Sequence, residues 1–159
     1  MKKLKGRAER GSLMNVGRRV DYAVRALSYL AGQPPGKVIS RAEIIKEQDI
    51  PSNYLSKIMK DLVAPGLVQS HVGRNGGFSL TRPAHTISIK EVYEAVERPL
   101  VLMECLAKGE EYCPYCFVCP QISVWGKAQN LLTNYLAGVS VGDIMDQQGL
   151  RGRLISLHG

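Results

Sequence analysis

Apolar residues recur at helical spacing along the first part of the chain. Residues 18–31 and residues 52–63 each carry apolar side chains three or four positions apart, so each stretch predicts an amphipathic helix. Between them, Ser40 and Glu43 match a capping box, in which the serine hydroxyl accepts from the Glu43 amide and the Glu43 carboxylate returns the bond. A short helix is expected after Ser40, and Ser52 is expected to cap the next one. Two short helices joined by a tight turn are typical of a helix-turn-helix.

The pattern then changes to that of a hairpin. Residues 67–72 and 78–80 predict two strands, and the glycine-rich segment 73–77 between them predicts the hairpin tip. Ser88 and Glu91 form a second capping-box pair and start a further helix. The predicted fold class is therefore mainly α: a winged helix-turn-helix with a two-stranded wing.

Helical spacing is lost between residues 98 and 120 and returns at Ile122. There it predicts a long amphipathic helix of ~25 Å at 1.5 Å per residue. A small domain that already has a core cannot bury this stripe, so a helix from a second subunit is the expected cover. Packing on the chain's own first helix is the alternative. The chain is thus divided into a basic N-terminal extension (1–15), a winged helix-turn-helix domain (16–97), a cysteine-rich loop (98–120), a dimerisation helix region (121–147) and a flexible tail (148–159).

Charge is concentrated at the start of the chain. Residues 1–25 carry eight Lys or Arg against Glu9 and Asp21, which is a net charge of +6. The whole 159-residue chain has a net charge of +7, so the rest of the chain is nearly neutral. A basic segment on a nearly neutral body is typical of contact with phosphates. No apolar run approaches the ~20 residues of a membrane span, and no apolar segment follows the basic start as in a secretory signal. We therefore expect a cytoplasmic protein with no membrane partner.

Four cysteines lie close together in the loop: Cys105, Cys113, Cys116 and Cys119. Thiols stay reduced in the cytosol, where clustered cysteines bind metal more often than they form disulfides. The run C-P-Y-C-F-V-C-P is similar to ferredoxin-type ligand runs, which favours an iron–sulfur cluster. Zinc is the less favoured alternative, because zinc sites usually pair two distant C-x-x-C motifs. A switch based on thiol oxidation alone is also open.

The helix-turn-helix and wing supply candidates for contact with double-stranded DNA. The second helix is expected to enter the major groove, with base or phosphate contacts from Ser52, Asn53, Tyr54 and Lys57. Arg74, beside Asn75 at the wing tip, is expected to reach the minor groove. Phosphate contacts are expected from Arg18, Arg19, Arg41 and Lys60. No arrangement typical of nucleophilic catalysis or of a phosphate-binding loop is present, so the chain is not expected to be an enzyme.

In this order of parts the chain resembles the Rrf family of winged-helix transcription regulators, in its iron–sulfur-sensing, IscR- and NsrR-like branch. The resemblance covers roughly residues 16–145 and is most specific at residues 18–27, 66–80 and 87–96. It implies a homodimer that binds palindromic promoter DNA.

The same resemblance implies a 2Fe-2S or 4Fe-4S cluster that senses nitric oxide, redox state or cluster supply. Its ligands would be Cys105, Cys113 and Cys119. One branch takes its fourth ligand from a histidine at the position of Ile122, so that pattern fails here. Another branch uses an aspartate of the other subunit, at the position of Asp21. Cys116 departs from the family's three-cysteine pattern, and the fourth ligand stays open between Asp21 and Cys116. An electron-transfer protein is the remaining alternative.

Overall fold

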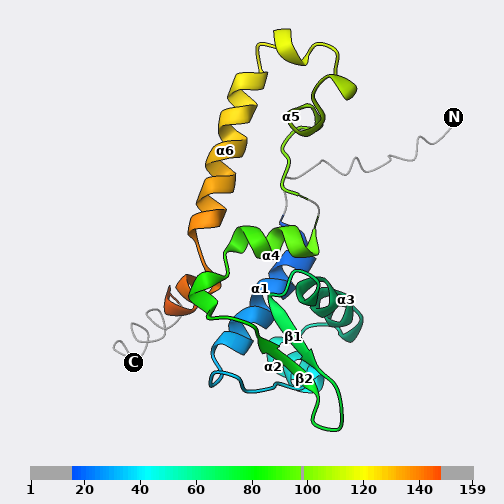
Figure 1. Cartoon of the computed structure of the whole chain (residues 1–159), viewed down its shortest axis with the longest axis vertical. Coiled ribbons are helices and arrows are strands. Elements are labelled where there is room, and N and C mark those ends of the chain that lie inside the picture. The colour runs from blue at the N-terminus through cyan, green and yellow to red at the C-terminus, as the bar shows by residue number, and fades with distance from the viewer. Residues whose placement is uncertain (1–15, 98, 148–159) are drawn as a thin grey trace, which may run out of the picture.

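The computed structural model describes residues 16–97 and 99–147, so the expected N-terminal extension (1–15) and tail (148–159) lie outside the described residues. Figure 1 shows a head, residues 16–97 with 139–147, and an arm, residues 99–138, that runs away from it. The elements are α1 (Arg18–Ala31), α2 (Arg41–Gln48), α3 (Ser52–Val63), β1 (Val68–His71), β2 (Gly77–Leu80), the 3-10 turn η1 (Ala84–Thr86), α4 (Ile89–Val96), α5 (Glu104–Lys108), the 3-10 turns η2 (Gly109–Glu111) and η3 (Cys116–Val118), and α6 (Ile122–Gly138). Residues 141–147 are also helical. The predicted mainly α winged helix with a two-stranded wing and a long helix is confirmed.

The core of the head lies where α1, α3 and α4 pack together. Their apolar positions fall three or four residues apart, so each helix presents one stripe to the others. Fully or almost fully buried side chains from these stripes include Val20, Ala23, Leu27, Leu55, Ile58, Leu62, Val92 and Val96. Burial of each large aliphatic side chain contributes about 1.5–3 kcal/mol, so this cluster is the main source of stability of the head.

Two of the three expected helix caps differ from the sequence prediction. The Ser40 hydroxyl accepts from the Glu43 amide over 3.2 Å, but Glu43 Oε1 accepts from the hydroxyl of Tyr29 on α1 instead of returning the bond to Ser40. Ser52 is already inside α3, whose N-cap is Pro51, and the Ser52 hydroxyl accepts from Arg41 over 2.6 Å. The predicted box at residues 88 and 91 is complete, with both reciprocal bonds present.

The wing is a two-stranded antiparallel hairpin with a third strand-like contact. β1 pairs with β2 in the register Val68 with Leu80 to His71 with Gly77. On the other edge of β2, Phe78 exchanges backbone hydrogen bonds of 2.8 and 2.9 Å with Ile39, the residue before the cap of α2. The wing is thereby attached to the helix-turn-helix through backbone bonds.

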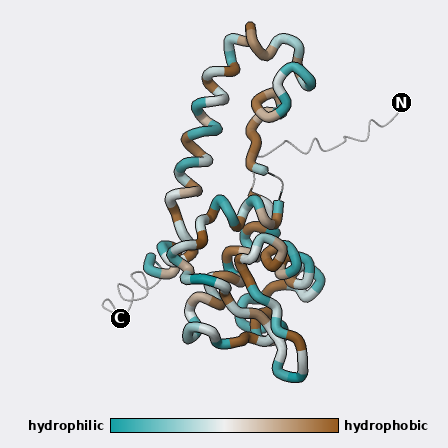
Figure 2. Tube along the Cα trace, viewed as in Figure 1, coloured by the Kyte–Doolittle hydropathy of each residue, from teal (hydrophilic) through white to brown (hydrophobic). Residues whose placement is uncertain are grey.

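The arm consists of a segment that leaves α4, a tip that carries the cysteines, and α6, which returns to the head (Figure 1). α6 packs on α4 and α5, yet none of its residues is buried. Val124, Leu131 and Tyr135 are 63%, 73% and 69% exposed. Hydrophobic and hydrophilic residues alternate along this helix in Figure 2. No helix within the described ranges is long and apolar enough to cross a membrane.

The chain re-enters the head beside the start of α4. The amide of Ile89 donates to Val139 O over 2.8 Å, and the amide of Val141 donates to Ile87 O over 2.9 Å. Ser140 caps the helical segment that follows, in a full reciprocal box with Asp143. These bonds fix the lower end of the arm to the head.

Candidate nucleic-acid interface and cysteine site

The outer face of α3 is polar and exposed. Leu55, Ile58, Met59 and Leu62 point into the core, and this orientation leaves Ser52, Asn53, Tyr54, Lys57 and Lys60 at the surface. A groove of about 470 Å³ on this face is lined by Arg19, Asn53, Tyr54, Lys57, Lys60 and Asp61. The expected base-reading and phosphate-binding residues of α3 are therefore on one accessible face.

The arginines expected to bind phosphates differ in their surroundings. Arg18 is exposed, whereas Arg19 forms a 2.5 Å ion pair with Asp61 on α3. Arg41 donates to the backbone oxygen and hydroxyl of Ser52 over 3.0 and 2.6 Å, which holds α2 against the start of α3. Arg41 therefore has a positioning contact that the sequence did not indicate.

The wing tip is fully accessible. Arg74 and Asn75 are exposed, in a turn that the amide of Gly76 closes by donating to Gly73 O over 3.0 Å. Gly73 has a φ of 118°, which favours glycine. The turn thus presents Arg74 at the far end of the hairpin.

A line of contacts runs from Asp21 through Arg25 and Tyr22 to α3, the helix expected to enter the major groove. The sequence did not indicate Arg25 or Tyr22 as members of the site. Arg25 lies 3.7 Å from Asp21, and its guanidinium lies 5.7 Å from the ring centre of Tyr22 and donates to Gln48 O at the end of α2. The Tyr22 ring meets Tyr54 edge-on with centres 5.6 Å apart. The i, i+4 spacing of Asp21 and Arg25 is the one signal of this pairing in the sequence.

The four cysteines occupy the outer part of the arm. Cys105 lies on α5, Cys113 lies between η2 and η3, Cys116 begins η3, and Cys119 follows it. Cys116 is 3% exposed and the other three cysteines are partly exposed, and none of the four forms a disulfide. The three thiols expected to be ligands are thus the accessible ones.

Cys116 lies among the other groups of the site. Burial raises the pKa of the Cys116 thiol, and nearby Glu110, Cys113 and Cys105 raise this pKa further. The four sulfurs are nevertheless not gathered at one point. In the searched ranges 16–97 and 99–147, the metal-ligand group with atoms within 4.8 Å of one another contains no cysteine. Asp21 is exposed on α1.

An exposed recognition helix, a wing and a helix-turn-helix define a winged-helix DNA-binding protein. Three comparisons agree with this class. The model of the Rrf2 family, described as an iron-dependent transcriptional regulator, matches residues 16–147. Protein aau3 of Rhizobium meliloti strain 1021 is 34% identical over 133 residues, which are 83% of this chain and 85% of that protein.

Solved structures show the same fold. T. potens IscR aligns with a TM-score of 0.62 and 24% identity, covering 85% of this chain and 88% of its own. CymR, the global cysteine regulator of B. subtilis, aligns with a TM-score of 0.65 and 20% identity, covering 85% and 98%. The chain belongs to the Rrf2 family of DNA-binding transcription regulators. The predicted family is confirmed, and so is the prediction that the chain is not an enzyme.

Proposed function

We propose that this regulator is a homodimer whose binding to promoter DNA is controlled by an iron–sulfur cluster. The ligands would be Cys105, Cys113 and Cys119. The observation that carries the proposal is the placement of three partly exposed thiols at the tip of an arm whose long helix buries none of its residues. When bound, the cluster would supply a group that reacts with nitric oxide and oxidants.

The donor set fits such a cluster. Soft thiolates are the ligands that iron–sulfur clusters use, and the tip supplies them within one short irregular segment. Cys116 and the partner subunit's Asp21 are the two candidates for the fourth ligand.

Dimerisation through α6 would give the exposed apolar residues of that helix a cover. Leu131 and Tyr135 are both more than two-thirds exposed in the single chain, and exposed apolar stripes of this kind mark interfaces. A second copy with the same stripe is the simplest partner, since a two-fold axis pairs identical surfaces.

Ligation by Asp21 would link the cluster to the recognition helix. Binding of the Asp21 carboxylate to a cluster would weaken its ion pair with Arg25. Arg25 is also bonded to α2 and lies on Tyr22, which contacts Tyr54 on α3. Cluster loss would then change the contacts that orient α3, and only such a difference in contacts can shift DNA affinity.

Anaerobic purification tests the proposal. Iron and acid-labile sulfide should be present without zinc, and gel shifts should show different promoter affinities for the holo and apo forms. Asp21→Asn and Cys116→Ser then identify the fourth ligand, because only loss of the true ligand should release iron. Material that binds no iron after reconstitution, or holo and apo forms with equal affinity for promoter DNA, would refute cluster control.

A switch based on thiols alone is the second candidate. It is favoured by the ungrouped sulfurs and by the similarity in fold to a cysteine regulator. In that case the metal-free protein should lose or gain DNA affinity on mild oxidation, and Cys113→Ser should abolish the response. The cluster model predicts that oxidation of metal-free protein has no such effect.

A further inference from the structure

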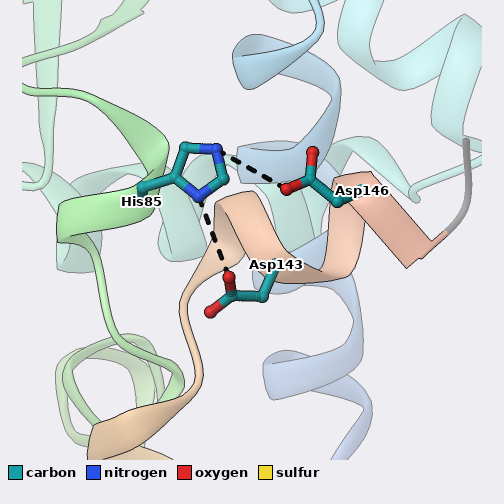
Figure 3. A group of neighbouring side chains, drawn as sticks. All are labelled: His85, Asp143 and Asp146. Atoms are coloured by element: carbon teal, nitrogen blue, oxygen red, sulfur yellow. Dashed lines mark ion pairs between the residues drawn. The ribbon is translucent and has the colours of Figure 1, made fainter.

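His85, Asp143 and Asp146 meet where the chain beyond the arm rejoins the head (Figure 3). His85 belongs to η1, directly after the wing, and both aspartates lie on the helical segment 141–147. His85 Nδ1 is 3.8 Å from Asp143 Oδ1, and His85 Nε2 is 3.8 Å from Asp146 Oδ2. One ligand atom of each residue lies within 4.8 Å of the other two. None of these residues belongs to the DNA-facing surface or to the cysteine site.

The spacing of the three groups is wider than that of hydrogen-bonded partners. Hydrogen bonds from nitrogen to oxygen span roughly 2.7–3.2 Å, so neither 3.8 Å contact is one. Two ligand atoms bound tetrahedrally to one divalent ion at about 2.0–2.2 Å stand roughly 3.4 Å apart. His85, Asp143 and Asp146 are 60%, 49% and 69% exposed, so small rotations of these side chains can close the difference.

Neighbouring groups already orient two of the three side chains. Asp143 Oδ2 accepts from the amide and hydroxyl of Ser140 over 2.8 and 2.7 Å, which turns Oδ1 toward His85. The same amide and hydroxyl of Ser140 lower the pKa of the Asp143 carboxyl, and His85 lowers this pKa further. The His85 ring lies on the backbone of Gly142, where an added Cβ would be 2.3 Å from Nδ1. Such supporting contacts orient ligands in known metal sites.

We propose that His85, Asp143 and Asp146 bind a divalent first-row transition-metal ion. One imidazole nitrogen and two carboxylate oxygens would coordinate the ion, and water would complete the shell. An imidazole ligand favours ions of the manganese-to-zinc series over calcium and magnesium, which prefer oxygen alone. Soft thiolates are absent from the group, so its preference differs from that of the cysteine site. Exposure of all three side chains makes the ion exchangeable with solvent.

A bound ion would join two parts of the chain that are 58 or more positions apart in sequence. η1 is continuous with the wing, and the segment 141–147 is continuous with α6. The site lies next to the backbone bonds of Ile87 and Ile89 to the end of the arm. The ion would therefore stiffen the junction between arm and head, independently of any cluster.

Mn²⁺ is a suitable probe, because thiolates bind it poorly while carboxylate oxygens bind it well. Full-length protein freed of metal with a chelator is titrated with Mn²⁺, and the free ion is measured by electron paramagnetic resonance. His85→Gln and Asp146→Asn remove ligands without touching the Ser140–Asp143 cap. Glu94→Gln, at an exposed ion pair on α4, is the matched control.

The expected result is saturable binding of about one ion per chain, weakened roughly tenfold or more by His85→Gln and by Asp146→Asn and unchanged by Glu94→Gln. The amide resonance of Gly142 should broaden at lower Mn²⁺ concentration, and more strongly, than that of Gly77 in the wing. Binding that does not saturate, or an affinity that His85→Gln leaves unchanged, would overturn the site. If the three side chains form ion pairs and bind no metal, His85→Gln would leave the affinity for Mn²⁺ unchanged.

Discussion

The side-chain amide of Gln129 holds the backbone of Leu102. Gln129 Oε1 accepts from the Leu102 amide over 2.8 Å, while its Nε2 donates to Leu100 O over 2.6 Å and to the Thr133 hydroxyl over 3.0 Å. One glutamine in the middle of α6 thus attaches the segment that leads to the cysteines. Since no residue of α6 is buried in the single chain, these polar bonds are a principal restraint on the arm.

Gln129→Ala should loosen the arm. Loss of these partly buried bonds is expected to cost about 1–3 kcal/mol locally. Hydrogen exchange at residues 99–108 should become faster, while exchange in α1 and α3 stays unchanged. Asn130→Ala, at the exposed neighbouring position, is the control and should leave protection as it is. Equal exchange in both variants would mean that Gln129 does not restrain the segment.

Gly77→Ala should destabilise the head. An added Cβ would lie 2.1 Å from Ile39 O, so the wing and the loop before α2 must move apart. The expected loss in free energy of unfolding is about 1–3 kcal/mol, measured by urea denaturation. Gly138→Ala is the matched control, because its Cβ would meet no atom within 4 Å. A Gly77→Ala protein as stable as the control would contradict the close approach.

Arg74→Ala should weaken specific DNA binding by about 1–3 kcal/mol if the wing tip reads a groove. Operator affinity is measured by gel shift across a series of salt concentrations. Lys90→Ala removes the same charge from α4, where Lys90 pairs with Glu94, and should have little effect. An operator affinity that Arg74→Ala leaves at the wild-type value would exclude the wing tip from recognition.

Cys113→Ala should prevent binding of the proposed iron–sulfur cluster and leave the head folded. The buried hydrophobic cluster of the head contains no cysteine, so the thermal unfolding of the head should not change. Iron and sulfide analysis checks the loss of the cluster, and far-ultraviolet circular dichroism checks that the head stays folded. Leu27→Ala, in the core, is the comparison and should lower the free energy of unfolding by about 2–5 kcal/mol. Unfolding of Cys113→Ala would instead assign the metal a structural role.

Glu91 should make the head sensitive to acid. Burial opposes the charge of Glu91, but hydrogen bonds from Ser88 and Arg82 outweigh it and lower the pKa of this carboxyl below 4.5. Because the folded pKa is depressed, the stabilisation is present above the unfolded pKa and is lost as pH falls through the folded value.

Urea unfolding at several pH values checks the Glu91 prediction. Glu91→Gln should be less stable than wild type at neutral pH, and the difference should shrink below about pH 4. Glu94→Gln, whose carboxyl lies 3.8 Å from Lys90, serves as the control. A difference between Glu91→Gln and wild type that is constant across this range would show that protonation of Glu91 does not matter to folding.

Periodicity was enough to predict α1, α3, α4, the wing and the extent of α6, because the spacing of apolar residues repeats along each of these elements. The short helix α5 was not predicted, because it lies in the segment 98–120, where helical spacing is lost. The side-chain partners of polar residues were harder. Glu43 matched a capping box, yet Tyr29 of another helix competes for its carboxylate. The sequence predicted Ser52 as a helix cap, yet its hydroxyl accepts a hydrogen bond from Arg41 instead. Such partners depend on tertiary packing, which local spacing does not record.

Among the site residues, too, local spacing predicted positions along one element but not contacts between elements. Cysteine spacing pointed to the arm tip, and helical spacing placed Asn53 and Lys57 on the outer face of α3. The contact of Tyr22 with Tyr54 joins helices that are separated by α2, and the meeting of His85 with Asp146 depends on the return of the chain from the arm. No pattern within either segment carries that information.

The backbone bonds between Ile39 and Phe78 have a consequence for how the regulator meets a duplex. These bonds join the hairpin to the helix-turn-helix, since the edge of β2 is hydrogen-bonded to the residue that precedes Ser40. A duplex that contacts both α3 and the wing would then have to match the angle that these bonds set between the two elements. Adaptation to a variant half-site would come from bending of the nucleic acid.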